Sequence, residues 1–239
     1  MSSQASDDRP HLYTAWHSPF GWRAWTSLLE KGVDFVYHET DPYDKSPEWF
    51  KISPRGLAPA IHHKGRAVYE STVCIEYIDE AWPHEPRLMP SDPYDRAYVR
   101  MWADHVNKKI IPHIFGMIVK QTPEEQEQAK KDALDGILAY TQAMRDGGPY
   151  FLGAQFSLAD IVLGTFASIF FCMEHYRGFK VPETEQFARY HTWINAVKSR
   201  ESWQKVLPSR EKVLEDWRPY AEGKAQTELA KAARQGKTP

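Results

Sequence analysis

Alternating apolar and polar residues near the N-terminus predict a strand that begins at His11. The chain then turns at 17–18, and Pro19 opens a helix that ends at Gly32, because proline suits a first helical turn and glycine a helix end. A second strand is predicted over 34–39. A strand, a helix and another strand in this order are typical of an α/β layer.

The pattern continues with short elements up to residue 82. Lys64 and Gly65 separate two extended runs, and a two-residue connection ending in glycine indicates a tight hairpin. Ser71 is placed to cap the helix that follows. The predicted elements are a helix over 47–52, strands over 59–63 and 66–71, and a helix over 72–82. Together they predict a mixed four-stranded sheet.

The composition changes at 82–93, where four prolines indicate a linker, and strand patterns almost vanish beyond it. Apolar residues recur at helical spacing from Tyr94 to Ile118, with a kink or break expected at Pro112. Further helices are predicted over 123–145, 157–173, 184–199 and 201–217, the last broken at Pro208, and the tail from Pro219 is either a surface helix or frayed. Because the 157–173 segment is apolar almost all round, we expect it at the centre of the core. The predicted organisation is therefore an α/β domain over 1–82, with 1–9 disordered, a linker over 83–93 and an all-α domain over 94–239.

The overall charge and cysteine content narrow the class of protein. A net charge of −2 over 239 residues provides no general attraction to nucleic acid or to an anionic membrane. The polar N-terminus has no signal-peptide core, and no apolar run matches the expected length of a membrane span. Two distant cysteines make neither a metal motif nor a disulfide framework, which favours a reducing, cytoplasmic location.

Ser18 stands where the first predicted helix begins. Unpaired backbone N–H groups and the helix dipole favour an anion there, and the serine hydroxyl can donate one more hydrogen bond to an oxyanion or thiolate. An ordinary helix cap is the alternative role, and serine is common in it.

Two further features indicate a binding site for an amino-acid head group. Pro59 lies at the start of a strand, which is unfavourable unless it follows a special backbone such as a cis peptide after Ala58. Glu70 and Ser71 lie where a strand ends and a helix begins. The Glu70 carboxylate suits an ammonium group, and Ser71 with the helix N-terminus suits a carboxylate.

These residues, in this order, resemble the glutathione transferases, which have a thioredoxin-like N-terminal domain and an all-α C-terminal domain. The resemblance implies that Ala58 pairs through its backbone with the cysteinyl part of glutathione, while Glu70 and Ser71 hold the γ-glutamyl end. It also implies that Ser157-x-x-Asp160 is the family's capping box, with Phe156 and Ile161 as a hydrophobic staple. A homodimer is implied in the same way.

Within the family, Ser-Pro-Phe-Gly-Trp-Arg-Ala-Trp (18–25), Ser-Pro-Glu-Trp-Phe (46–50) and the 53–60 segment resemble the omega class. The match implies that Phe20 lines the glutathione site. It differs at Ser18, where omega proteins usually have cysteine, and at Ser46, where they have a lysine for the glycine carboxylate. Lys45, one residue earlier, is the candidate to replace that lysine.

Serine in place of cysteine changes the expected chemistry. A cysteine thiolate can form a mixed disulfide with glutathione, and serine cannot. A serine hydroxyl can instead stabilise glutathione's own thiolate for attack on an electrophile. The resemblance therefore predicts a transferase with glutathione as cosubstrate and no metal, acting by conjugation or glutathione-dependent reduction. A ligandin that binds aromatic molecules with little turnover and a fold-only interaction domain are the alternatives.

Aromatic residues of the helical domain are candidates for a hydrophobic cosubstrate pocket between the domains, although core packing is the favoured role for each. They are Trp102, His105, Phe115, Phe170, Tyr176 and Trp217. His62 and His63 are expected on opposite faces of one strand, which disfavours a shared metal.

Overall fold

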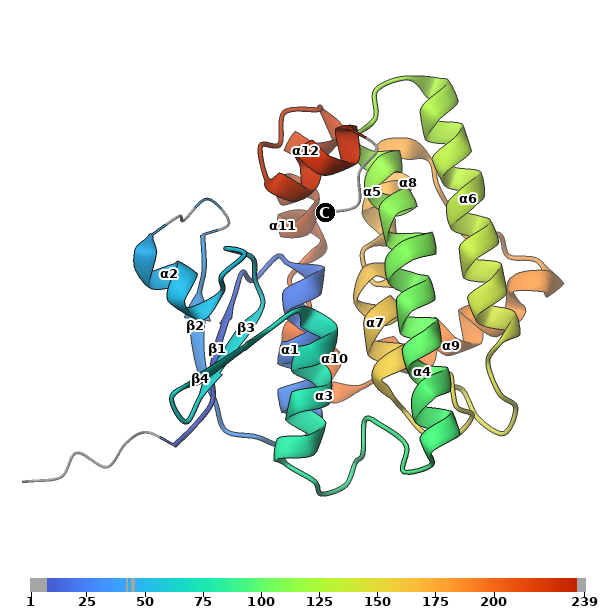
Figure 1. Cartoon of the computed structure of the whole chain (residues 1–239). Coiled ribbons are helices and arrows are strands. Elements are labelled where there is room, and N and C mark those ends of the chain that lie inside the picture. Colours follow the sequence, from blue (N-terminus) through green and yellow to red (C-terminus); the bar gives the residue numbers. More distant parts are fainter. Residues whose placement is uncertain (1–7, 42, 44–45, 236–239) are drawn as a thin grey trace, which may run out of the picture. The chain divides into compact units, whose positions relative to one another are not determined.

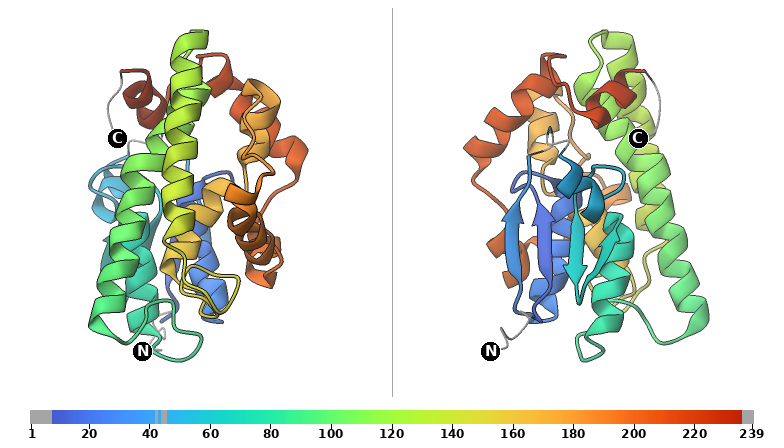
Figure 2. Two further views of the ribbon diagram at one scale, coloured as in Figure 1. Left: turned by 90° about the vertical axis from the view of Figure 1, so that its right-hand side faces the viewer. Right: turned by 60° about the vertical axis from the view of Figure 1, so that its left-hand side comes forward.

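In the computed structural model, which describes residues 8–41, 43 and 46–235, the N-terminal strands form one mixed sheet in the order β2-β1-β3-β4. The strands are β1 (His11–Thr14), β2 (Val36–Glu39), β3 (Ala60–His63) and β4 (Arg66–Tyr69). β1 pairs parallel with β2, whereas β1–β3 and β3–β4 are antiparallel. The right-hand view of Figure 2 shows the four strands side by side.

The connections explain this topology. The parallel pair is joined through the crossover helix α1 (Pro19–Glu30), as a parallel connection requires. β3 and β4 form the predicted hairpin, in which Lys64 and Gly65 have φ values of 49° and 73°. Positive φ at both central residues matches the right-handed twist of the flanking strands. The mixed sheet and the hairpin are therefore confirmed.

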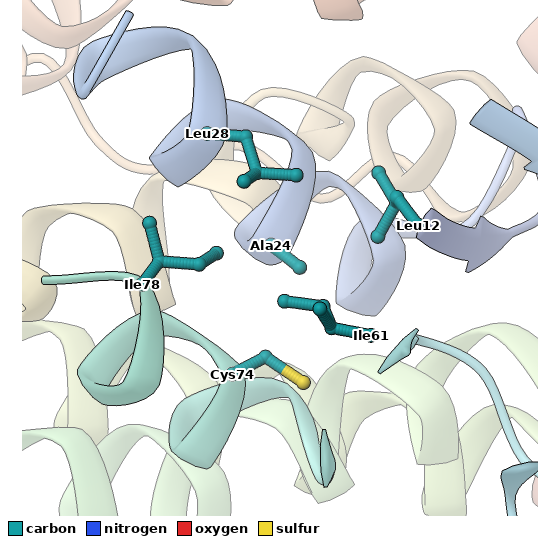
Figure 3. Packing of buried hydrophobic residues seen from close by; sticks show 6 residues of the cluster. All are labelled: Leu12, Ala24, Leu28, Ile61, Cys74 and Ile78. Carbon is teal, nitrogen blue, oxygen red and sulfur yellow. The ribbon is translucent and has the colours of Figure 1, made fainter. Parts of the chain in front are cut away.

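Helices α1 and α3 (Ser71–Ala81) pack on one face of the sheet. Leu12 and Ile61 come from the sheet, and the two helices add the remaining members of the core shown in Figure 3. The buried cluster is Leu12, Ala24, Leu28, Ile61, Cys74 and Ile78. Alternation along the strands directs apolar residues to this face and leaves polar aromatic residues for the other.

The opposite face carries histidine and tyrosine beside α2 (Pro47–Ile52). The Tyr13 ring stacks on His38 at 4.4 Å and lies 6.1 Å from Trp49 of α2. His62 lies on this face near His11. His63 instead forms a hydrogen bond with Tyr77 of α3, with 2.7 Å between Nδ1 and the tyrosine hydroxyl. The two adjacent histidines therefore face opposite sides, as the sequence predicts.

The N-terminal unit comprises residues 1–87 and the C-terminal unit residues 88–239. The expectation of disorder for 1–9 falls mainly on 1–7, which lie outside the described residues. Asp8 accepts a hydrogen bond from His63 at 3.1 Å through its carbonyl, and Arg9 pairs with Asp34 at 3.5 Å.

In the described part of the C-terminal unit the regular elements are helices, as predicted, and Figure 1 labels most of them. Its elements are α4 (Pro93–His105), α5 (Ile111–Val119), α6 (Pro123–Gln142), α7 (Leu158–Ala167), α8 (Phe170–Arg177), α9 (Ala188–Lys198), α10 (Glu201–Val206), α11 (Arg210–Ala221) and α12 (Glu228–Arg234), with a π-helical turn at Val106–Ile110 and a 3-10 turn at Glu185–Phe187. The π turn lies directly before Pro112, whose missing N–H interrupts the α-helical bonding. The predicted break is therefore present, and so is the break around Pro208.

Helix α7 is the core helix, because all ten of its residues are buried. The capping box of Ser157 and Asp160 is confirmed, with both reciprocal bonds present. The predicted single helix to Met173 is wrong, since α7 ends at Ala167 and α8 begins at Phe170. At the break, Ser168 donates its hydroxyl to the Gly164 carbonyl at 2.8 Å, a local bond that competes with regular helix.

The sequence was expected to contain no apolar run as long as a membrane span. The segment Leu158–Arg177, which comprises α7 and α8, does have the length and apolar composition of one. Most residues of this apolar segment are buried within the structure, which is typical of a core helix. Of the two alternatives predicted for the tail, the described part forms a helix, α12, rather than a frayed end. Pro219 lies inside α11, and Thr227 caps α12 by accepting from the Ala230 N–H at 3.2 Å.

Candidate functional site

Ser18 follows a tight turn between β1 and α1. The turn is closed by the Ser18 N–H, which donates to the Ala15 carbonyl at 3.0 Å. The Ser18 hydroxyl oxygen accepts from the Gly21 N–H at 3.2 Å and thus caps α1. A hydroxyl has one donor proton and two acceptor lone pairs, so capping leaves the proton available to a ligand. The cap role and the site role of Ser18 are therefore compatible.

Residues that the sequence pattern did not identify hold this turn in place. Trp22 donates its indole N–H to the Trp16 carbonyl at 2.7 Å, and the Trp16 N–H donates to the Glu39 carboxylate at 3.1 Å. A Cβ added to Gly21 would lie 1.7 Å from Oγ1 of the buried Thr14, so only glycine fits there. No local motif indicates these contacts, since they join residues of different elements.

Arg23 connects α1 to the start of α3. Its guanidinium is buried, donates to the Ser71 hydroxyl oxygen at 2.9 Å and lies 5.0 Å from the Phe20 ring centroid. Burial lowers the pKa of Arg23 to about 9, so the side chain remains a cation at neutral pH. Because the arginine only donates, the Ser71 oxygen accepts, and the Ser71 proton is directed elsewhere.

The Ala58–Pro59 bond is cis, as predicted. The turn before it is tightly bonded, because the Gly56 N–H donates to the Ser53 carbonyl at 2.7 Å. The Ser53 hydroxyl also accepts from the Leu57 N–H at 3.1 Å and donates to the Leu57 carbonyl at 2.7 Å. Ala58 thus enters β3 from a well-defined backbone.

Glu70 and Ser71 join β4 to α3. Glu70 has φ 68°, which is uncommon for a residue other than glycine and costs on the order of 1–3 kcal/mol. The prediction that Ser71 caps α3 is wrong, because Glu70 is the cap residue and Ser71 is the first helical residue. The unusual Glu70 backbone starts the helix one residue earlier. Ser71 nevertheless lies at the helix N-terminus, where its N–H and hydroxyl suit an anion.

The Glu70 carboxylate is half exposed and pairs with Arg55 at 2.7 Å. These contacts form a continuous series, from Phe20 through Arg23 to Ser71 and from the adjacent Glu70 to Arg55. Arg55 belongs to the same turn as Ala58. These contacts link two pairs of features that the sequence places at the site. Arg23 links Phe20 to Ser71, and Arg55 links Glu70 to the turn before Ala58. Lys45, the candidate for a glycine carboxylate, lies outside the described residues.

The aromatic candidates of the helical unit fall into separate clusters. The Trp102 ring lies 4.8 Å from His105, and His105 Nε2 is 2.9 Å from the Gly136 carbonyl oxygen. Phe115 stacks on Trp217 at 5.6 Å between centroids. Phe115 and Trp217 are buried, which fits the core role, whereas Trp102 and His105 are half-buried.

The two remaining candidates of that set come from α8. The Phe170 ring lies 5.7 Å from Phe179, and Tyr176 donates its hydroxyl to the Leu214 carbonyl at 2.6 Å. Neither contact involves the Trp102 or Phe115 clusters. The contacts described here thus join Trp102 to His105 and Phe115 to Trp217, and they join Phe170 and Tyr176 to residues outside the candidate set.

Metal and thiol chemistry gain no support within 8–41, 43 and 46–235. No group of three histidine, cysteine or acidic side chains there is arranged to hold a metal ion. Cys74 and Cys172 are both buried free thiols. Burial raises the pKa of the Cys172 thiol to about 12 and that of Cys74 further still, so neither forms a reactive thiolate.

Similarity to known proteins agrees with this geometry. Residues 17–81 match the glutathione S-transferase N-terminal domain, and residues 123–196 match the C-terminal domain of the same family. Glutathione S-transferase U19 of Arabidopsis thaliana is 37% identical over 205 residues, covering 85% of this chain and 92% of the relative. The chain therefore belongs to the glutathione S-transferase family.

Solved structures share the whole fold. Glutathione transferase Omega 3C from Trametes versicolor has a TM-score of 0.81 and 38% identity, covering 93% of this chain and 94% of its own. The Tau class enzyme MiGSTU from mango, Mangifera indica, has a TM-score of 0.82 and 28% identity, covering 92% and 100%. Both an omega and a tau protein thus resemble this chain over nearly its full length.

Proposed function

We propose that this protein is a glutathione transferase in which Ser18 stabilises the glutathione thiolate. Glu70 binds the ammonium of the γ-glutamyl end, Ser71 binds its carboxylate, and the Ala58 backbone pairs with the cysteinyl residue. Phe20 lines this site, and Lys45 binds the glycine carboxylate. The observation that carries the proposal is the Ser18 cap, whose oxygen accepts from Gly21 while its proton stays available at the positive end of a twelve-residue helix.

The energy that this role requires is within reach of one hydroxyl. A free thiol has a pKa of about 8.5, so about 3% is thiolate at pH 7, and lowering the pKa by one unit raises this to about 24%. That shift needs about 1.4 kcal/mol. A hydrogen bond to a charged group contributes roughly 1.5–3 kcal/mol, before the helix N-terminus adds its own field. The Ser18 hydroxyl is therefore sufficient.

The thiolate then attacks a hydrophobic electrophile, forming a carbon–sulfur bond as the leaving group departs, or it serves as the reductant of a glutathione-dependent reduction. We assign the electrophile's contacts to the half-buried members of the aromatic set, Trp102, His105 and Tyr176. The other three candidates, Phe115, Phe170 and Trp217, are buried in the core. We further propose a cytoplasmic homodimer. The motif around Ser18 favours an omega-like protein, and similarity to a tau enzyme makes that class the alternative.

Two substitutions test the role of Ser18. Ser18→Ala should raise the pKa of the bound thiol and slow conjugation, while glutathione affinity is mostly kept because Glu70, Ser71 and Ala58 are unchanged. Ser18→Cys places a thiol at a helix N-terminus, where its pKa falls, and should gain thiol-transferase activity while losing conjugation. Thiolate absorbance of the complex against pH and both activities are measured on all three proteins.

A matched control separates thiolate activation from helix capping. Ser209 caps α11 in the same way, accepting from the Lys212 N–H at 3.4 Å. Ser209→Ala should cost about 1 kcal/mol of stability, like any lost cap, and leave conjugation unchanged. If Ser18→Ala conjugates as fast as the parent and Ser18→Cys gains no thiol transfer, Ser18 is only a cap and the proposal is wrong.

A further inference from the structure

The ion pair between Arg55 and Glu70 lies at the proposed γ-glutamyl site, and its arginine has no role in the function proposed above. Nη1 of Arg55 is 2.7 Å from Oε1 of Glu70, and the two side chains are 50% and 48% exposed. A half-exposed pair is weakly held, because water competes for both charges. A ligand with its own charges can therefore open it.

Both partners are attached to well-defined backbone. Arg55 occupies the turn that Ser53 closes through its bonds to Gly56 and Leu57, and this turn leads directly to Ala58. On the other side, the positive φ of Glu70 is followed by the helix that begins at Ser71. The spacing of the cation and the anion is thus set by the fold.

A second cation, Arg23, completes the charge pattern. It is buried and donates to the Ser71 oxygen at 2.9 Å, so this bond does not use the Ser71 proton, which can be donated to a ligand. The site therefore has one carboxylate, Glu70, beside an exposed guanidinium and a serine donor. An α-amino acid zwitterion has the complementary pair, an ammonium and a carboxylate on one carbon.

We propose that Arg55 is a specificity-determining residue that binds the α-carboxylate of the glutamyl end together with Ser71. On binding, the Arg55–Glu70 pair opens, the ammonium takes Glu70 and the carboxylate takes Arg55, so one internal ion pair is exchanged for two with the ligand. A ligand with only the ammonium leaves Arg55 competing for Glu70, and a ligand with only the carboxylate leaves Glu70 repelling it. This inference rests on the proposed function, because it extends the same glutathione site.

The test compares three ligands by calorimetry: glutathione, an analogue without the α-carboxylate (γ-aminobutyryl-cysteinyl-glycine) and one without the amino group (glutaryl-cysteinyl-glycine). We expect Arg55→Gln to weaken glutathione binding by roughly tenfold, the scale of one charge-assisted hydrogen bond, and to leave the decarboxylated analogue unchanged or tighter. The preference for glutathione over that analogue should therefore fall by roughly tenfold or more.

Arg66→Gln is the matched control, because Arg66 is an exposed arginine at the start of β4 and its loss should change none of the three affinities. Thermal unfolding of both variants checks that each is folded. If Arg55→Gln changes all three affinities by the same factor, or tightens glutathione itself, Arg55 does not bind the carboxylate and this inference is wrong. If the unmodified protein does not bind glutathione, the proposed function itself is wrong, and this result is distinct from a failure of the Arg55 inference.

Discussion

Asp160 provides the most direct test of how the helical unit is held together. Its side chain is fully buried at the start of α7 and accepts four hydrogen bonds. Oδ1 accepts from the Phe151 N–H at 2.7 Å and from the Trp193 indole at 2.8 Å. Oδ2 accepts from the Ser157 N–H at 2.8 Å and from its hydroxyl at 2.9 Å. One carboxylate thus joins the loop before α7, the cap and α9.

Asp160→Asn removes the acceptor at one of these positions while keeping the shape. An amide nitrogen at the Oδ1 position would face two groups that can only donate, so it will take the Oδ2 position, where the Ser157 hydroxyl can turn to accept from it. The Ser157 N–H then loses its acceptor. A buried unpaired donor costs roughly 1–3 kcal/mol, and the two remaining bonds lose their charge assistance. We expect a total loss of about 2–4 kcal/mol at pH 7, where the folded-state carboxylate is charged.

The pH dependence gives a second, independent readout. Burial raises the pKa of Asp160 to about 6, whereas an unfolded aspartate has about 3.9. Between these values the folded state binds more protons than the unfolded state, so the stability of the parent falls as pH rises. The asparagine variant lacks this contribution. The difference in free energy of unfolding between the parent and the variant should therefore narrow by about 1–2 kcal/mol between pH 5 and pH 7.

Urea unfolding of the parent, Asp160→Asn and Ser157→Ala at both pH values measures these differences. Ser157→Ala removes only the hydroxyl and should cost about 1 kcal/mol, because the carboxylate still accepts the Ser157 N–H. A cost for Asp160→Asn no larger than that of Ser157→Ala would refute the hydrogen-bond reasoning. If the difference in free energy of unfolding between the parent and Asp160→Asn widens with rising pH, the folded state stabilises the charged carboxylate and the pH reasoning is wrong.

Three further predictions follow from the N-terminal unit and from the family. Gly21→Ala should destabilise the protein by about 1–3 kcal/mol in thermal unfolding, since its Cβ meets Thr14, and Thr14→Ala in the same chain should restore part of the loss. Glu70→Ala should weaken glutathione binding more than Lys45→Ala in calorimetry, because Glu70 is held beside the ligand's ammonium; equal losses would contradict the proposed ligand placement. Sedimentation at micromolar concentration should show a homodimer, and a monomer alone would count against it.

Local signals in the sequence were enough for much of the fold. Lys64 and Gly65 indicated the hairpin, Pro112 the interruption before α5, and Ser157 with Asp160 the start of the core helix. Each depends on the backbone preferences of a few consecutive residues, so no tertiary information is needed. The break at Ser168 was not predicted, because the hydroxyl that donates to the Gly164 carbonyl also accepts from the Trp203 indole at 2.7 Å, a contact with a helix distant in sequence.

Part of the proposed site could be predicted from the sequence for the same reason. Ser18, Ala58 and Glu70 each stand at an end of a helix or strand, and element ends are visible in the pattern of residues. Their roles toward glutathione remain predictions. The arginines were not assigned a role, because an arginine in a turn or on a helix is ordinarily a solvated side chain.

The sequence by itself determined the order of elements, the glutathione transferase resemblance and the chemical types at the proposed site. Only the tertiary structure decided which of these groups act on one another. Arg23 reaches Ser71 across 48 positions, and Arg55 reaches Glu70 across 15. The physical reason is that charge pairing depends on distance in space, which the packing of α1, α3 and the turn before β3 sets, whereas periodicity and capping depend on neighbours along the chain.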